Sequence, residues 1–217
     1  MRVAACARPG GAAVPRPAAV PGLTAGDGWE PAAGRRGAGR AATAPMGVSG
    51  LLGHTMCFLR QGQQLLLLNR RRQPAMGLWT GVGGKIEPGE TPLQGALREV
   101  HEETAIQVEG ARFAGVVSWG HGGMYAFVVD LPPDFVYAAP RDTDEGVLAW
   151  QDLGWILDAD NYGVARHVRQ ALPALLAGER CEEHCFTFAS GAGSTDWTIL
   201  EYATAPLRPE ALARTRR

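Results

Sequence analysis

Three glutamates stand at the spacing that places their carboxylates on one face of a helix. Glu99, Glu102 and Glu103 occupy positions i, i+3 and i+4. Like charges at this spacing destabilise an isolated helix by roughly a few tenths of a kcal/mol per pair, so folding alone gives no reason to gather them. A hard divalent cation removes the repulsion, because Mg²⁺ prefers carboxylate oxygens and completes its coordination with substrate phosphates. The spacing therefore predicts a magnesium site, and a solvated helix face is the alternative.

A glycine-rich loop precedes this segment and favours the metal interpretation. Gly81, Gly83, Gly84 and Gly89 surround Lys85, so the backbone can approach an anion and present amide groups and a carbonyl without obstruction by side chains. We expect Lys85 to contact phosphate. The basic run at residues 70–72 is either a further phosphate contact or an exposed basic turn.

A loop acid is spaced to brace the acidic helix. Glu90 lies eight residues before Arg98, so the loop can fold back and let the guanidinium bind the carboxylate through two hydrogen bonds. Such a brace would hold the metal-binding face in place. Another group of acids, Asp142, Asp144 and Glu145, could supply a carboxylate to the site from outside the helix.

These residues together resemble the Nudix box, written G-x5-E-x7-R-E-U-x-E-E-x-G-U, where U is a bulky aliphatic residue. The matching positions fall in register over a span of 23 residues: Gly84, Glu90, Arg98, Glu99, Val100, Glu102, Glu103 and Ile106. Ala105 departs from the pattern, which has glycine there. Glycine commonly takes a left-handed conformation at a helix end, and alanine enters it at a cost of roughly 1 kcal/mol. We therefore expect Ala105 to shift the helix end more than the metal face.

The resemblance implies a fold and a role for each matching residue. The fold would be α/β, a Nudix α/β/α sandwich with a mixed β-sheet. The cofactor would be Mg²⁺, with Mn²⁺ able to substitute, and its ligands would be the Gly84 carbonyl, Glu99, Glu102 and Glu103. Glu102 or Glu99 would activate water, with Arg98 as a further catalytic residue and Glu90 as its structural brace. Metal ions neutralise charge that develops on phosphoryl oxygens, so positioning and electrostatics do most of the catalysis.

The segment leading into the box narrows the substrate. The run from Gly77 to Lys85 is similar to that of MutT-related enzymes, which remove oxidised purine triphosphates. This resemblance implies hydrolysis of a purine nucleoside triphosphate, with 8-oxo-dGTP as the leading candidate, to the monophosphate and pyrophosphate. The residues it implies for substrate binding are Lys85, Thr80, Asp158, Asp160 and Asn161. Thr80 stands where the mammalian enzyme has asparagine, and a helix cap is the competing interpretation of the two aspartates.

Two other functions stay open at this point. Within the enzyme class, the substrate could be a dinucleoside polyphosphate or a nucleotide sugar. In a different class, some Nudix-like domains sense nucleotides without hydrolysing them. Those modules often lose box glutamates, whereas this chain retains all three. The retained glutamates favour the enzyme.

Composition excludes several classes of partner. The chain has 217 residues, of which 46% are apolar and 20% charged, as in an ordinary soluble globular protein. Its net charge of -1 provides no field to hold a nucleic acid polymer or an acidic membrane. The apolar runs fall short of the roughly 20 residues that span a bilayer. Four scattered cysteines fit a reducing cytoplasm better than a disulfide scaffold. The oligomeric state is left open.

The chain divides near Met46. Residues 1–45 are crowded with Ala, Gly, Pro and Arg and show no apolar period. They are expected to be a disordered tail or translated sequence upstream of a start at Met46, and a targeting segment is a further alternative. Residues 46–217 form the predicted Nudix hydrolase domain.

Apolar periodicity within that domain predicts strands and helices in alternation. Helices are expected at 92–104 and 164–176, with Thr91 capping the first, Pro92 at its first position and Gly178 ending the second. Strands are expected at 55–59, 65–68, 108–118, 124–130 and 147–150, followed by a closing hairpin of 185–189 and 197–203. A mixed sheet is implied.

Overall fold

The computed structural model describes residues 4–5, 52–120, 122–178, 181–189, 198–209, 211 and 215. In chain order the elements are β1 (Ala4–Ala5), β2 (His54–Gln61), β3 (Gln64–Arg70), β4 (Trp79–Thr80), α1 (Pro92–Thr104), β5 (Ile106–Gln107), β6 (Arg112–Trp119), β7 (Gly122–Asp130), β8 (Arg141–Asp142), β9 (Gly146–Asp152), α2 (Leu153–Leu157), α3 (Arg166–Ala177), β10 (Glu182–Phe188) and β11 (Ile199–Pro206).

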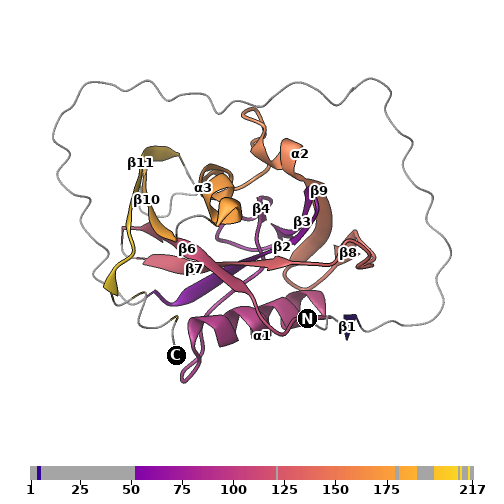
Figure 1. Cartoon of the computed structure of the whole chain (residues 1–217). Coiled ribbons are helices and arrows are strands. Elements are labelled where there is room, and N and C mark those ends of the chain that lie inside the picture. The colour runs from indigo at the N-terminus through magenta and orange to yellow at the C-terminus, as the bar shows by residue number, and fades with distance from the viewer. Residues whose placement is uncertain are drawn as a thin grey trace. The chain divides into compact units, whose positions relative to one another are not determined.

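Most of the strands form one mixed sheet. Its order is β11-β10-β6-β7-β2-β3-β9-β8, and β4 pairs with β3. The pairs β2–β7 and β6–β10 are parallel, and the other neighbours are antiparallel. In Figure 1, α1 lies on one face of the sheet and α2 and α3 lie on the other. The predicted α/β/α sandwich with a mixed sheet is confirmed.

Strands β2 and β3 alternate between two buried cores. The core on the α1 face takes Cys57, Leu59, Leu66 and Leu68. The core on the α3 face takes Met56, Phe58, Leu65 and Leu67. A slip of one residue would exchange every side chain between the faces, so this alternation fixes the register of both strands. The central strands thereby give the glycine loop a rigid support.

Helix α1 begins as the sequence predicts and ends without the expected shift. The Thr91 hydroxyl accepts from the Gln94 N–H at 3.2 Å, and the Gln94 side-chain oxygen accepts from the Thr91 N–H at 2.8 Å. This is a reciprocal capping box, with Pro92 in the first turn. Ala105 adopts the left-handed conformation itself (φ 59°), and its N–H donates to the His101 carbonyl at 2.8 Å. The predicted shift of the helix end was therefore wrong.

Helix α3 and the final hairpin occur close to the predicted ranges. Helix α3 ends at a left-handed Gly178 (φ 67°), as its sequence indicates. The Arg112 guanidinium of β6 donates to the carbonyls of Leu175 and Leu176, both at 3.2 Å, and so satisfies exposed acceptors at this helix end. Strands β10 and β11 pair antiparallel, as the predicted hairpin requires.

The predicted tail is described only at Ala4–Ala5. These residues form β1, which pairs antiparallel with β5 in a separate two-stranded sheet. The predicted boundary at Met46, the rest of residues 1–45 and the turn of the final hairpin lie outside the described residues. No helix in the described ranges is both long and apolar enough to cross a membrane.

Candidate active site

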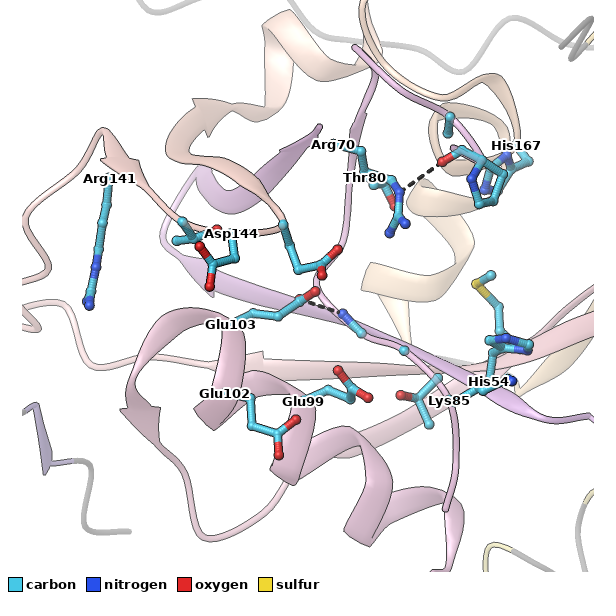
Figure 2. Close-up of a pocket in the computed structure, with 18 of the residues that line it drawn as sticks. His54, Arg70, Thr80, Lys85, Glu99, Glu102, Glu103, Arg141, Asp144 and His167 are labelled. Carbon is cyan, nitrogen blue, oxygen red and sulfur yellow. Dashed lines mark hydrogen bonds between the residues drawn. The ribbon is translucent and has the colours of Figure 1, made fainter. Parts of the chain in front are cut away.

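A cavity of about 870 Å³ brings the glycine loop and α1 together with residues from the rest of the sheet. Its volume lies within the range of roughly 300–1,000 Å³ that is usual for small-molecule sites. Glu99, Glu102 and Glu103 all line it. Figure 2 shows these glutamates on one side of the cavity, with Thr80 and His167 on the other. One side of the cavity is therefore acidic, and the other side presents the hydroxyl of Thr80 and the imidazole of His167.

The glycine loop is fixed in place by backbone hydrogen bonds to β2. Cys57 and Val82 exchange two bonds, of 2.7 and 3.1 Å, and the Thr55 N–H donates to the Gly84 carbonyl at 2.8 Å. A Cβ on Gly83, which has φ +146°, would lie 2.3 Å from the Thr55 carbonyl oxygen. The close approach of loop and strand therefore requires glycine at position 83.

Glu103 links the end of α1 to this loop. Its Oε2 accepts from the Gly83 N–H at 2.9 Å. Burial raises the pKa of Glu103 to about 7, although the hydrogen bond from Gly83 opposes the shift, and the nearby charges of Glu99 and Glu145 raise it further. A cation beside this carboxyl group would favour its ionised form. A bound cation would thus offset the cost of ionising the buried Glu103 side chain.

Glu99 lies directly against Gly84. A Cβ built on Gly84 would be 2.5 Å from the Glu99 Oε1, so any other residue at position 84 would displace the carboxylate. Burial raises the pKa of Glu99, and the hydrogen bond from Arg98 opposes that shift. The glycine of the box therefore permits contact between a carboxylate and the loop backbone.

Arg98 gathers the carboxylates around itself. Its Nε and Nη2 donate to the two oxygens of Glu90 at 2.8 and 3.2 Å, which is the predicted bidentate brace. Its Nη1 donates to Glu99 at 2.9 Å and to Glu102 at 2.8 Å. Its Nη2 also donates to the Lys85 carbonyl at 2.8 Å. These contacts hold the pKa of Glu90 below its ordinary value and raise that of Arg98. The contacts to Glu99 and Glu102 were not foreseen from the sequence.

The donor set fits a hard divalent cation. It consists of the carboxylates of Glu99, Glu102 and Glu103 and the Gly84 carbonyl, which are all oxygen ligands. The Gly84 oxygen already accepts from Thr55, but a carbonyl keeps a second lone pair. Among the described residues, no three His, Cys, Asp or Glu side chains are already gathered at metal-binding distances. Glu99 and Glu102 instead converge on Arg98.

Basic side chains border the acidic surface. Lys85, Arg70 and Arg141 line the cavity, and Arg70 opposes the raised pKa of Glu103 through its charge. Arg141 donates to the Thr104 carbonyl at 3.3 Å, at the end of α1. Phosphate contacts were predicted from the sequence for Lys85 and for Arg70, but not for Arg141.

The neighbouring arginines pair with acids in β8 and in the loop that follows it. Arg71 forms a salt bridge with Asp142, and Arg72 lies 3.8 Å from Glu145. Asp142 and Glu145 line the cavity together with Asp144. This loop therefore brings carboxylates to the site from outside the helix.

The far side of the cavity includes one predicted residue and several unpredicted ones. Thr80, which is 8% exposed, lines it, and its hydroxyl donates to the Gly81 carbonyl at 3.2 Å. His167 lies on this side with Trp119 beside it, and Met124 also contributes to the cavity lining. His167 had a sequence signal: it is a polar residue three positions after Val164, on the apolar stripe of the helical segment.

The other predicted base-contacting residues lie outside the cavity lining. Asp158 and Asp160 are exposed, and the Asp158 carboxylate accepts from the Asp160 N–H at 2.8 Å. Asn161 donates to the Trp155 carbonyl at 2.7 Å and accepts from the Gly163 N–H at 2.9 Å. These side chains order their own loop in the structure. Their contact with a base stays a prediction.

Comparison with known proteins gives concordant matches. A family model described as NUDIX domain matches residues 52–168. The chain is 26% identical over 161 residues to the uncharacterized Nudix hydrolase YvcI of Bacillus subtilis, covering 70% of this chain and 93% of that protein. It is 32% identical over 109 residues to the oxidized purine nucleoside triphosphate hydrolase of Mus musculus, covering 49% of this chain and 70% of that protein.

A solved structure supports the fold. The crystal structure of a MutT protein from Bacillus halodurans matches with a TM-score of 0.56 at 24% identity, and the match covers 73% of this chain and 100% of that one. At this level of identity, the likeness concerns the arrangement of helices and strands.

Proposed function

Because the chain belongs to the Nudix family and is a hydrolase of phosphoric anhydride bonds in nucleotides, we propose that its substrate is a purine nucleoside triphosphate. The products are the nucleoside monophosphate and pyrophosphate, and 8-oxo-dGTP is the leading candidate. The observation that carries the proposal is the composition of the cavity, in which the box glutamates lie across from Thr80 and His167, with Trp119 beside His167. An anionic chain and a flat base need two surfaces of these kinds.

Magnesium is the proposed cofactor, with Mn²⁺ able to substitute. Glu99, Glu102, Glu103 and the Gly84 carbonyl would hold it, since they supply the oxygen ligands that the ion prefers. When bound, the cation neutralises charge that develops on the phosphoryl oxygens. Arg98 keeps Glu99 and Glu102 close to the loop, and the glycine at position 84 leaves room for them.

Hydrolysis requires a group that takes a proton from water. Water attacks a phosphorus atom, the anhydride P–O bond breaks, and the proton of the water passes to a carboxylate. The side chain of Glu102 is 57% exposed and that of Glu99 is 15% exposed. Both line the cavity, so both are retained as the proposed general base, and Glu102 has the freer access to solvent.

Cations at the rim are proposed to bind the phosphate chain. The Arg70 Nε donates to the Pro74 carbonyl at 2.9 Å. The other N–H groups of its guanidinium can donate to a phosphate. Lys85, which follows Gly84 in the chain, provides a second charge in the cavity lining. We place the nucleoside toward Thr80, and Asp158, Asp160 and Asn161 remain proposed base contacts that would require their loop to move.

The resemblance to the mouse enzyme supports the choice of purine. That relative is an oxidized purine nucleoside triphosphate hydrolase, and the alignment covers 70% of it. The chain also matches NAD-capped RNA hydrolases, for example that of Pasteurella multocida with 39% identity, but over only 74 residues and 28% of that protein. The longer alignment therefore favours a triphosphate.

A panel of nucleotides tests the proposal. Values of kcat/KM would be measured side by side for purine and pyrimidine triphosphates, 8-oxo-dGTP, dinucleoside polyphosphates and nucleotide sugars, with Mg²⁺ and with a chelator. We expect a purine triphosphate to give the highest kcat/KM, pyrophosphate to be released, and the chelator to stop the reaction. Preference by tenfold or more for a dinucleoside polyphosphate or a nucleotide sugar, which is about 1.4 kcal/mol, would overturn the choice of substrate.

A further inference from the structure

A buried histidine lines the side of the cavity that faces away from the glutamates. His167 is the second residue of α3, is 7% exposed and contributes to the cavity wall. It lies on the same side of the cavity as Thr80 in Figure 2. Its neighbour on the wall is Trp119, which also lines the cavity. Thr80, Trp119 and His167 do not belong to the acidic surface, so they form a separate part of the site.

Aromatic rings surround His167 and hold its imidazole in one orientation. The ring centroids of Trp119, Phe186 and Phe188 lie 6.3, 6.2 and 6.2 Å from that of His167. Rings packed in this way lose little further freedom when a ligand binds. His167 is therefore preorganised for contact with whatever occupies this end of the cavity.

An imidazole is a costly choice for this position. Burial lowers the pKa of His167 to about 4, so the side chain is neutral at pH 7. A neutral imidazole carries one N–H donor and one acceptor, and burying polar groups in an aromatic environment costs free energy that a phenylalanine would avoid. Because His167 borders the cavity, its imidazole brings this donor and acceptor to the wall that a ligand would meet.

We propose that His167 determines base specificity by hydrogen bonding to the edge of the purine, with Trp119 forming the adjoining wall. This inference rests on the proposed function, and it adds the residue that distinguishes one purine from another. A purine edge suits a neutral group that can both donate and accept, because its carbonyl oxygens accept hydrogen bonds and its N–H groups donate them. A phosphate would instead be drawn to the charged rim at Lys85 and Arg70.

The position of the acidic loop strengthens the assignment. Asp158 and Asp160 are exposed and are not among the residues that line the cavity. The Arg169 guanidinium donates to the carbonyls of Asp158, Ala159 and Asn161 at 2.7 to 2.9 Å and fixes their loop. In the described structure, His167 and Thr80 thus present polar side chains to the cavity, whereas Asp158 and Asp160 lie outside its lining.

The test compares two buried histidines. His167→Phe keeps a ring and removes both nitrogens, and His167→Leu is a second apolar variant should the larger ring disturb folding. The matched control is His184→Phe. His184 is 1% exposed and stacks on Tyr202, with its Nδ1 2.9 Å from the Tyr202 Oη, and it does not line the cavity. Thermal unfolding establishes that each variant is folded before kinetics are measured.

The readout is the ranking of purine triphosphates. Values of kcat/KM for 8-oxo-dGTP, dGTP and dATP would be measured for the parent and each variant. We expect the preference of the parent for its best purine to fall about tenfold in His167→Phe and His167→Leu, since one hydrogen bond to the base is lost. In His184→Phe, the ranking should be unchanged. His167→Gln, whose amide donates and accepts, should recover part of the preference.

The outcomes separate this inference from the proposed function. If the parent hydrolyses purine triphosphates but both apolar His167 variants keep its ranking within about threefold, which is below the expected loss of one hydrogen bond, only the specificity role is overturned. An equal change of ranking in His184→Phe would also overturn it. If the parent hydrolyses no purine triphosphate, the proposed function and this inference fail together.

Discussion

The two sides of the cavity are built in different ways. The box residues of the acidic side lie within residues 83–103, and Arg98 connects Glu90, Glu99 and Glu102 within that short segment. The far side takes Thr80 from β4, Trp119 from β6 and His167 from α3, which only the folded sheet brings together. The residues proposed for hydrolysis thus come from one short segment of sequence. Those proposed for substrate choice are brought together only by the tertiary fold.

The largest expected effect is at Glu102, on the acidic side. Glu102→Gln keeps the size of the side chain but removes its charge, so it weakens both cation binding and proton acceptance. We expect kcat with Mg²⁺ to fall by roughly 100-fold or more, with thermal unfolding unchanged, as measured by pyrophosphate release. Glu109→Gln, at an exposed position after β5, is the matched control. Equal activity of the Glu102 variant and the parent would refute the role assigned to Glu102.

Gly84→Ala tests the close contact on the same side. Its Cβ would meet the Glu99 Oε1 at 2.5 Å and push the carboxylate away from the loop. Displacing a catalytic group by about 1 Å can reduce activity by roughly 100-fold, and we expect a loss of that order in kcat/KM. Gly110→Ala serves as the control, because nothing lies within 4 Å of a Cβ there. Wild-type activity in Gly84→Ala would show that Glu99 need not touch the loop.

On the far side, His167 should make the free energy of unfolding depend on pH. The pKa of His167 falls from 6.5 to about 4 on folding because of burial, so the unfolded chain binds a proton more readily. Stability is therefore complete above pH 6.5 and is lost as the pH falls toward 4, by up to about 3 kcal/mol. Urea unfolding between pH 7 and 4 would measure this loss, and His167→Phe should show a shallower pH dependence. Parallel curves for both proteins would argue that His167 is not buried neutral.

The smallest effect concerns the position where the box departs from its pattern. Ala105 holds a left-handed conformation with φ 59°, which glycine adopts without steric cost. Ala105→Gly should therefore raise the free energy of unfolding by up to about 1 kcal/mol, while kcat/KM stays unchanged. Chemical denaturation and a standard turnover assay would measure the two quantities. A loss of activity would mean that the helix end affects the acidic surface.

The contrast between the two sides also explains what the sequence could reveal. The helix of residues 92–104, its Thr91 cap and the Glu90–Arg98 brace depend on neighbours within a few turns of chain, and each was predictable from spacing. The strands β2 and β3 were predictable from their apolar runs, and their alternation between two cores follows from burial on both faces.

What escaped prediction depends on distant contacts. His167 lies within the apolar stripe of a predicted helix, so its position there suggested a core residue. No residue near it in the sequence indicates that Trp119 of β6 will pack beside it. Asp158 and Asp160 looked suited to a base, but Arg169 binds the carbonyls of their loop, a contact that residue spacing does not encode. Arg141 reaches the end of α1 only because β8 pairs at the edge of the sheet.

The central claim is that the carboxylates of α1 bind a divalent cation for hydrolysis. Its most direct test is a titration with Mn²⁺, following the free ion by electron paramagnetic resonance, for the parent and for a variant with Glu99, Glu102 and Glu103 all changed to Gln. The account predicts that the parent binds Mn²⁺ in competition with Mg²⁺ and that the folded triple variant does not. Equal Mn²⁺ binding by the two proteins would contradict it.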